Sequence, residues 1–125
     1  MAEMMTVSEI ITKALDDKEY RLQLASSFGK GNDFKYTDNS VSEELFLTFI
    51  ERFKKDKELL RIYDNINYYI LEEKNISDAV FQALVKVAKK RKNRWIFLGL
   101  THADLKPEHM QYLKSLKFLN ESDFY

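Results

Sequence analysis

The segment THADLKPEHM, residues 101–110, holds both histidines of the chain together with two carboxylates. Imidazole nitrogens and carboxylate oxygens are ligands for zinc, and histidine is the most common general base in catalysis. His102 and His109 do not follow the His-Glu-x-x-His spacing, and the chain has no cysteine that would complete a tetrahedral site. We therefore expect His109 to be a structural residue that leans inward and His102 to lie in a turn. We predict no metal ion and no other cofactor.

Other catalytic groupings are missing from the sequence as well. There is no Gly-x-Ser-x-Gly turn, and the GKG of residues 29–31 is too short for a phosphate-binding loop. Adjacent acids such as Glu43 and Glu44 point about 100° apart on a helix, so they do not converge on one bond. The serines are explained by positions at which helices begin. We predict that the protein is not an enzyme.

A basic run is the strongest signal for a nucleic-acid ligand. The segment KVAKKRKNRW, residues 86–95, brings six positive charges within nine residues, next to Trp95. Such a cluster can hold phosphates with a salt-dependent affinity. Cations are also favoured near a helix C-terminus by the macrodipole, which is the structural alternative. The residues of the nucleic-acid hypothesis are Lys86, Lys89, Lys90, Arg91, Lys92 and Arg94.

Aromatic residues mixed with acids indicate a surface for a protein partner. Tyr63, Tyr68 and Tyr69 cannot all face inward on one helix, since positions 68 and 69 diverge by about 100°. Outside the helical pattern, the segments NDFKYTD (32–38) and ESDFY (121–125) combine rings with carboxylates. Rings anchor protein interfaces, and carboxylates steer a basic partner. The predicted contact residues are Asp33, Phe34, Tyr36, Asp38, Glu72 and Glu73, with Asp123, Phe124 and Tyr125 as an outlying group.

Four similar segments predict the elements that position these residues. They are TVSE (6–9), SVSE (40–43), NISD (75–78) and DLKP (104–107). Each begins with a residue whose side-chain oxygen can cap a helix, followed by an aliphatic residue. The first two read as capping boxes, the third as a weaker relative, and the fourth has a first-turn proline. Apolar residues at later helical spacings predict an amphipathic helix in each unit.

A second helix is predicted in three of the units. The segments that begin at Asp17 and at Asp56 start alike, with an acidic cap, and run to about Phe28 and about Glu73. Asn93 is expected to cap a short helix through Leu100. The units are 34, 35 and 29 residues apart, the range of helical-hairpin repeats. The fold class is therefore all-α, with about six to seven helices, arranged as quasi-repeated hairpins of an α-solenoid-like type or as an irregular bundle.

The composition is consistent with one helical domain over residues 1–125. Only 3 Gly and 1 Pro are present, which favours helices over a fold with many turns. The absence of cysteine fits a reducing compartment, and the start MAEMMTVSE does not resemble a signal peptide. The longest apolar run, WIFLGL, is far shorter than the roughly 20 residues of a membrane span. We expect a soluble, cytoplasmic protein that does not enter membranes.

The charge is unevenly distributed although the chain is neutral overall. Residues 1–78 hold 16 acids and 11 bases, a net charge of −5, and residues 79–125 hold 4 acids and 9 bases, a net charge of +5. An acidic and a basic surface can each orient a charged partner.

In its overall type, the chain resembles small all-helical bacterial immunity proteins of contact-dependent growth inhibition systems. The resemblance lies in the small size, the absence of cysteine and the Lys- and Asn-rich composition, and no single motif carries it. It implies a tight stoichiometric complex with a toxin domain, often a nuclease with a basic cleft, which the acidic residues would complement. An antagonist of a host defence complex, made by a mobile element, would use the same binding physics.

Overall fold

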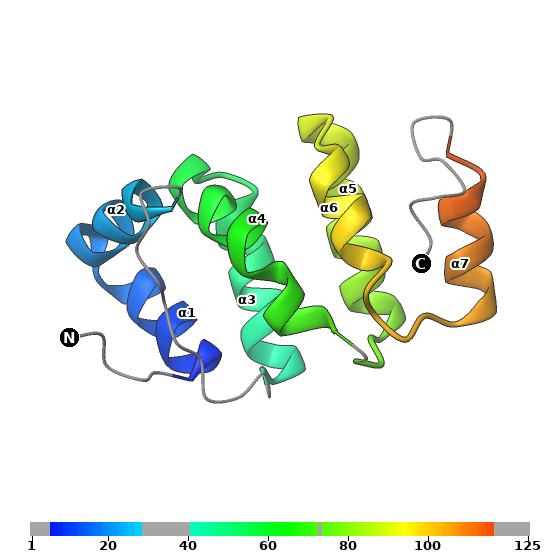
Figure 1. Cartoon of the computed structure of the whole chain (residues 1–125), viewed down its shortest axis with the longest axis horizontal. Coiled ribbons are helices and arrows are strands. Elements are labelled where there is room, and N and C mark those ends of the chain that lie inside the picture. Colours follow the sequence, from blue (N-terminus) through cyan, green and yellow to red (C-terminus); the bar gives the residue numbers. More distant parts are fainter. Residues whose placement is uncertain (1–5, 29–40, 73, 117–125) are drawn as a thin grey trace. The chain divides into compact units, whose positions relative to one another are not determined.

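The computed structural model describes residues 6–28, 41–72 and 74–116. These residues form seven α-helices and no strand, apart from an isolated parallel bridge between Asn75 and Asp104 (Figure 1). The all-α prediction is confirmed. The helices are α1 (Val7–Asp16), α2 (Lys18–Ser27), α3 (Glu43–Phe53), α4 (Lys57–Leu71), α5 (Asp78–Arg91), α6 (Arg94–Leu100) and α7 (Pro107–Lys114).

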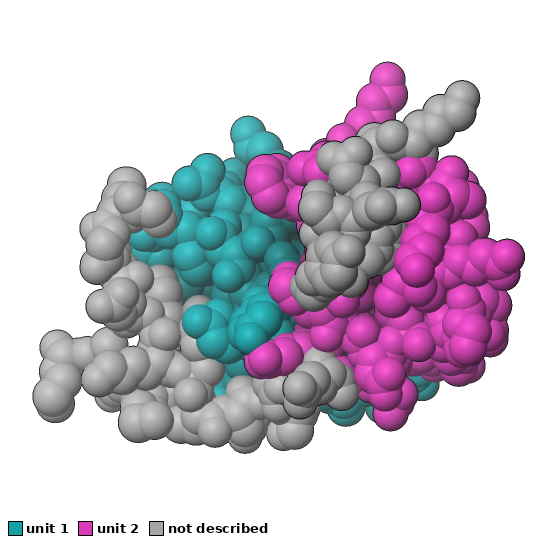
Figure 2. Space-filling view, turned by 45° about the vertical axis from the view of Figure 1, so that its right-hand side comes forward, with its two compact units in different colours: residues 1–70 teal, residues 71–125 magenta. Residues whose placement is uncertain are grey.

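The chain divides into two compact units, residues 1–70 and residues 71–125, which Figure 2 colours separately. The first unit contains α1, α2, α3 and nearly all of α4, and the second contains α5, α6 and α7. A single domain over the whole chain stays a prediction. None of the helices in the described ranges has both the length and the apolar character that a membrane crossing requires.

The first repeated segment starts its helix as predicted. Thr6 is the N-cap of α1: its hydroxyl accepts from the backbone N–H of Glu9, and the Glu9 carboxylate accepts from the N–H of Thr6. This reciprocal pair is a complete capping box.

In the other three segments the helix begins two residues later than the alignment predicts. The N-caps are Ser42, Ser77 and Lys106 in the third position of each segment. Ser42 and Ser77 accept from the N–H groups of Leu45 and Val80, whereas Lys106 precedes a first-turn proline and makes no side-chain cap. The predicted second capping box is therefore wrong, because the residue at N3 of α3 is an apolar leucine.

The shift has a physical reason in the aliphatic residue of each segment. In α3 and α5 that residue, Val41 or Ile76, precedes the cap and is buried. The residue at the fourth helical position, Phe46 or Phe81, is also buried. This is the sequence pattern of a hydrophobic staple, which fixes the direction in which the chain enters the helix.

The second helices of the first unit have the predicted caps. Asp17 is both the C-cap of α1 and the N-cap of α2, and its carboxylate accepts from the N–H of Tyr20. Asp56 accepts from the N–H groups of Glu58 and Leu59 at the start of α4. Each short connection therefore stops one helix and starts the next within a few residues.

A cluster of aromatic rings joins α3 to α4 inside the first unit. Tyr63 of α4 is fully buried, and its ring stacks on Phe53 of α3 with centroids 4.6 Å apart. Phe49 meets Tyr63 edge-on at 5.9 Å, and Phe46 lies at 6.0 Å. Rings packed in this way bury a large apolar area, which is the dominant stabilising contribution in a small helical unit.

Arg21 of α2 ties three helices of the first unit together. Its guanidinium donates to the carbonyl oxygens of Ala14 (2.8 Å) and Leu15 (3.0 Å), which lie in the last turn of α1. It also forms an ion pair of 3.0 Å with Asp56 at the start of α4. The last carbonyls of a helix have no partner within the helix, so this arginine satisfies two of them from outside.

In the second unit, α5 and α6 form a hairpin closed by Lys92 and Asn93. Lys92 has a left-handed backbone with φ 52°, and the N–H of Asn93 donates to the carbonyl of Ala88 at 2.9 Å. The N–H of Lys92 donates to the carbonyl of Lys89. This is a Schellman motif, which commonly has glycine at the left-handed position. The Asn93 side chain then accepts from the N–H groups of Trp95 and Ile96, as predicted for a cap of α6.

Helix α7 packs on α5 through His109. The imidazole of His109 stacks on the ring of Phe81 with centroids 4.0 Å apart and an interplanar angle of 14°. Tyr112, one turn further along α7, meets Phe81 edge-on at 6.1 Å. The segments that precede α5 and α7 are also joined, since the backbone N–H of Asp104 donates to the carbonyl of Lys74 at 2.9 Å.

Candidate functional site

Most residues of the predicted protein-binding surface lie outside the described part of the chain. Only Glu72 is described: it is exposed in the turn that directly follows α4. The residues outside the described ranges are Asp33, Phe34, Tyr36, Asp38, Glu73, Asp123, Phe124 and Tyr125. Their roles remain predictions.

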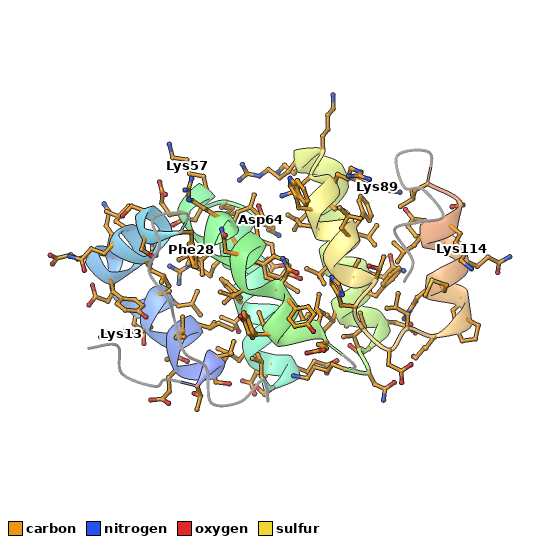
Figure 3. The ribbon with its side chains drawn as sticks, in the orientation of Figure 1. Lys13, Phe28, Lys57, Asp64, Lys89 and Lys114 are labelled. Carbon is orange, nitrogen blue, oxygen red and sulfur yellow. The ribbon has the colours of Figure 1, made fainter. Side chains whose placement is uncertain are left out.

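Two adjacent tyrosines of α4 face outward. Tyr68 is 43% exposed and Tyr69 is 40% exposed, whereas Tyr63 on the same helix is fully buried. The prediction that the three tyrosines cannot share the inner face is confirmed. The two outer rings meet edge-on with centroids 5.9 Å apart. Asp64, which Figure 3 labels on α4, comes four residues before Tyr68 in the sequence. We define Tyr68 and Tyr69 as the α4 tyrosine pair.

The basic run occupies the end of the α5–α6 hairpin. Lys86, Lys89, Lys90, Arg91 and Lys92 are exposed, and Arg94 is half-buried. The structure therefore gathers the six predicted cations at the last turns of α5, at the Lys92 that follows it and at the first residue of α6. Figure 3 labels Lys89 near that end of the helix. The cations at this end of the hairpin are chemically suited to binding an anion.

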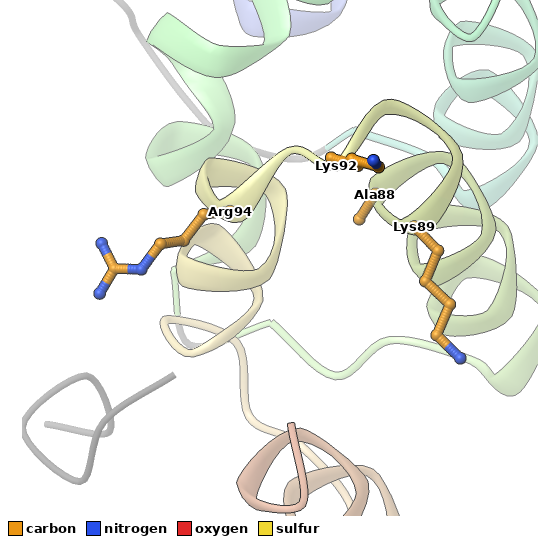
Figure 4. A pocket seen from close by; sticks show the side chains of 4 residues that line it. All are labelled: Ala88, Lys89, Lys92 and Arg94. Carbon is orange, nitrogen blue, oxygen red and sulfur yellow. The ribbon is translucent and has the colours of Figure 1, made fainter. Parts of the chain in front are cut away.

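A pocket of about 380 Å³ opens between the last turn of α5 and the start of α6. Of the described residues, Ala88, Lys89, Lys92 and Arg94 line it (Figure 4). Ala88 is fully buried, while the two lysines are exposed. The volume lies within the range of small-molecule sites. The cations are evident in the sequence, whereas the pocket arises from the α5–α6 hairpin, since residues of both helices line it.

Trp95, the single tryptophan of the chain, is 64% exposed in the first turn of α6. A tryptophan is usually highly buried, so this degree of exposure is uncommon. Exposed indole rings stack on bases and anchor protein interfaces. The ring therefore extends the chemistry of the basic end beyond charge alone.

The two histidines lie as expected. His109 is 3% exposed, whereas His102 is exposed in the turn after α6. Within the described ranges, no group of three or more His, Asp or Glu residues is arranged to hold a metal ion.

The clustering of Asp78, Lys106 and His109 was not predicted from the sequence. The Nε2 of His109 lies 2.6 Å from Oδ1 of Asp78, and the Lys106 ammonium lies 3.5 Å from the same oxygen. The hydrogen bond from His109, followed by the charge of Lys106, lowers the pKa of Asp78. The sequence predicted that His109 leans inward, and a buried imidazole needs a hydrogen-bond partner. Which residue is that partner depends on the packing of α7 on α5.

Comparison of the chain with models of protein families, with curated proteins and with solved structures gives no match.

Proposed function

We propose that the protein is a protein-binding inhibitor that acts in the cytoplasm, and that its target is a bacterial toxin domain, most economically a nuclease. The observation that supports protein binding is the α4 tyrosine pair. Two large rings stand side by side on the outer face of a helix whose inner face is already filled by Tyr63 and its neighbours. The resemblance to immunity proteins supports the choice of a toxin as the partner.

The chemistry of the tyrosine pair suits an interface. A tyrosine offers a large apolar ring and a hydroxyl that can donate and accept, and it has few rotatable bonds to order on binding. Exposed aromatic rings at the centre of an interface account for much of its binding free energy. The edge-on contact between Tyr68 and Tyr69 holds both rings in a defined arrangement before a partner arrives.

The acidic first part of the chain complements a basic target. Residues 1–78 have a net charge of −5, and Glu72 is exposed next to the end of α4. A nuclease cleft must attract phosphates and is therefore basic, so an acidic inhibitor is steered towards it. An inhibitor of this kind needs no reacting group, since it acts by covering the cleft.

The test begins with the gene next to this one. Its product is expressed in a host cell with and without this protein, and growth is measured. We expect the neighbouring product to be toxic and co-expression to restore growth. The double variant Tyr68→Ala and Tyr69→Ala should weaken the purified complex by about 30-fold or more, the effect of losing a binding hot spot of 2 kcal/mol.

Leu22→Ala is the matched control, because Leu22 is a large apolar residue of the same unit and is 45% exposed on a different helix, α2. It should leave the affinity unchanged. If the neighbouring product is not toxic, the toxin target is wrong. If the complex forms but the tyrosine variant binds as tightly as the wild type, the α4 tyrosine pair is not the interface. If the protein is instead an antagonist of a host defence complex, it binds that complex through the same surface. Co-expression with the neighbouring gene product then does not restore growth, whereas the double tyrosine variant weakens binding to the defence complex.

Nucleic-acid binding is the second candidate, and the exposed Trp95 beside the six cations favours it. Indole stacking on bases combined with phosphate neutralisation is the usual way in which single strands are bound. The affinity should then fall steeply with salt, because each neutralised phosphate releases a counterion. The variant with Lys86, Lys89, Lys90 and Lys92 changed to Ala should lose most of the binding in a fluorescence-anisotropy titration. Tight binding that does not depend on salt would contradict this candidate.

A further inference from the structure

We propose that α7 opens from α5 as a separate step, before the rest of the second unit unfolds, and that the carboxylate of Asp78 controls this opening. In the closed form α7 covers Phe81 of α5, and in the open form it uncovers this ring. The two helices pack on each other within the second unit (Figure 1). The inference is independent of the protein-partner proposal, because none of its residues belongs to α4.

The apolar anchorage of α7 is small. Helix α5 buries six residues and α6 buries four, whereas α7 buries only His109 and Leu113. One of these two residues is polar, so Leu113 is the single apolar residue that α7 buries completely. Buried apolar area is the main contribution that holds a helix on its neighbours. Of the three helices of the second unit, α7 is therefore held least by this contribution.

The surface of α7 that packs on α5 also contains two polar atoms without hydrogen bonds. Nδ1 of His109 and the hydroxyl of Tyr112 are buried, and neither has a hydrogen-bond partner among the described residues. Both rings pack on Phe81, with centroids 4.0 Å and 6.1 Å away. A buried polar atom without a partner has lost the hydrogen bonds that water provides, so the closed form is destabilised at two places. Opening returns both atoms to water.

The start of α7 is attached to α5 through one carboxylate. Oδ1 of Asp78 accepts from Nε2 of His109 at 2.6 Å, and the Lys106 ammonium lies 3.5 Å from the same oxygen. No side chain caps the N-terminus of α7, where Lys106 is the N-cap. An isolated helix of this length is not stable in water, so α7 needs its contacts with α5 to remain helical. A change at Asp78 therefore affects two links to α7 at once.

Acid weakens this attachment. The hydrogen bond from His109, and then the charge of Lys106, lowers the pKa of Asp78 in the closed form, and the carboxyl regains its ordinary pKa when α7 opens. Ionised Asp78 therefore stabilises the closed form above the ordinary pKa of about 4, and this stabilisation is lost as the pH falls through the lowered value. A second proton on the imidazole, at Nδ1, finds no acceptor among the described residues, which also favours the open form.

The test is hydrogen exchange of the full-length protein followed by NMR, with protection factors that correct for the intrinsic exchange rate at each pH. The backbone N–H groups of α7 should be protected about tenfold less than those in the middle of α5 and α6, because they exchange through local opening. One probe is the N–H of Met110, which donates to the carbonyl of Lys106. As the pH is lowered from about 6 to about 3, the protection of α7 should fall further relative to that of α5 and α6.

Variants of Asp78 separate its charge from its hydrogen bond. Asp78→Ala removes the acceptor of His109 and should increase the opening of α7 about tenfold or more, the effect of losing a hydrogen bond to a charged group. Asp78→Asn keeps an oxygen that accepts from His109 but does not ionise, so α7 should lose most of its response to acid. His109→Phe keeps a ring against Phe81 without a donor for Asp78, and it should lose most of the response as well. Gln111→Ala is the matched control, since Gln111 is exposed on α7, and it should leave opening and response unchanged.

Three outcomes would overturn the proposal. The first is that the N–H groups of α7 are protected as strongly as those of α5 and α6, because α7 then opens only together with the other two helices. The second is that Asp78→Ala lowers protection equally in all three helices, which would show that Asp78 acts only as an acid in the first turn of α5. The third is an acid response of α7 that is the same in Asp78→Asn as in the wild type, which would show that another group controls the opening.

Discussion

The Nε2 of His109 lies 2.6 Å from Oδ1 of Asp78, so a buried ring of α7 is tied to the first residue of α5. The contact spans 31 positions of the sequence and joins a 3% exposed imidazole to an exposed carboxylate. An ionised carboxylate can only accept, so Nε2–H is the donor. The stacking of His109 on Phe81 fixes the ring in the orientation that makes the bond.

The first prediction is that this contact makes stability depend on pH. The hydrogen bond from His109, and then the charge of Lys106, lowers the pKa of Asp78 in the folded state. A carboxyl whose folded pKa lies below its unfolded pKa stabilises the protein above the unfolded value, and this contribution is lost as the pH falls through the folded pKa. Asp78→Asn should therefore lower the free energy of unfolding at pH 7. The difference from the wild type should narrow below about pH 4. Urea unfolding at a series of pH values measures both.

Glu108→Gln is the control for this experiment. Glu108 is an exposed acid in the first turn of α7, as Asp78 is in α5, so both changes remove the same favourable interaction with a helix N-terminus. Only Asp78→Asn also removes the carboxylate charge that accepts from His109 and pairs with Lys106. If the two variants show the same loss at pH 7, the charge of Asp78 beside His109 and Lys106 does not contribute to stability.

The second prediction concerns Arg21. Its guanidinium donates to two carbonyls at the end of α1 and pairs with Asp56, and its side chain is only 12% exposed. Arg21→Met removes the donor to the carbonyl of Ala14 and leaves the carbonyl of Leu15 with only the longer hydrogen bond of 3.4 Å from Arg52, so it should lower the free energy of unfolding by about 2–3 kcal/mol. Lys54→Met, which breaks the more exposed pair with Glu51, should change it by less than about 1 kcal/mol. Equal effects in denaturant unfolding would show that Arg21 acts as an ordinary surface charge.

The third prediction is that Tyr63→Phe does not destabilise the protein. The Tyr63 hydroxyl is buried and has no hydrogen-bond partner among the described residues, and burial together with the charge of Asp64 raises its pKa. Removing a buried polar group that makes no hydrogen bond avoids its desolvation, so the free energy of unfolding should stay equal or rise by about 1 kcal/mol. Tyr63→Leu, which loses the ring stacked on Phe53, should be destabilising. A marked loss in Tyr63→Phe would show that the hydroxyl is hydrogen-bonded in solution.

The fourth prediction uses the left-handed backbone of Lys92. A residue with a Cβ is strained at φ 52°, whereas glycine is not. Lys92→Gly should therefore raise the free energy of unfolding by about 1 kcal/mol, which corresponds to a melting temperature higher by a few degrees. Lys90→Gly, in the helical last turn of α5, should instead lower it by about 1 kcal/mol. A melting temperature that falls in both variants would argue against a Schellman motif at this position.

Local chemistry determined most of the helical pattern. Thr6, Asp17 and Asn93 cap the helices that follow them by hydrogen bonds to N–H groups two or three residues away, so the sequence contains both partners. The helical spacing predicted that Tyr63, Tyr68 and Tyr69 cannot all face inward, since the angle between helical positions is independent of the fold. It did not say which face was inner, because that depends on Phe49 and Phe53 of α3.

The helix starts of α3, α5 and α7 show where local information was not enough. The segment SVSE contains two serines that can cap, and only the burial of Val41 decides for Ser42. Two nearby serines can cap a helix with hydrogen bonds of similar strength, so the burial of a single aliphatic side chain determines which serine is the N-cap.

The candidate sites divide in the same way. The exposure of the five cations in residues 86–92 followed from their charge, because the ionised groups of lysine and arginine stay in water unless they are paired. The pocket and the pairing of Asp78 with His109 came only from the tertiary structure. Both need residues that the backbone brings together across a turn or between helices, and the free energy of those contacts arises from packing that no single segment contains.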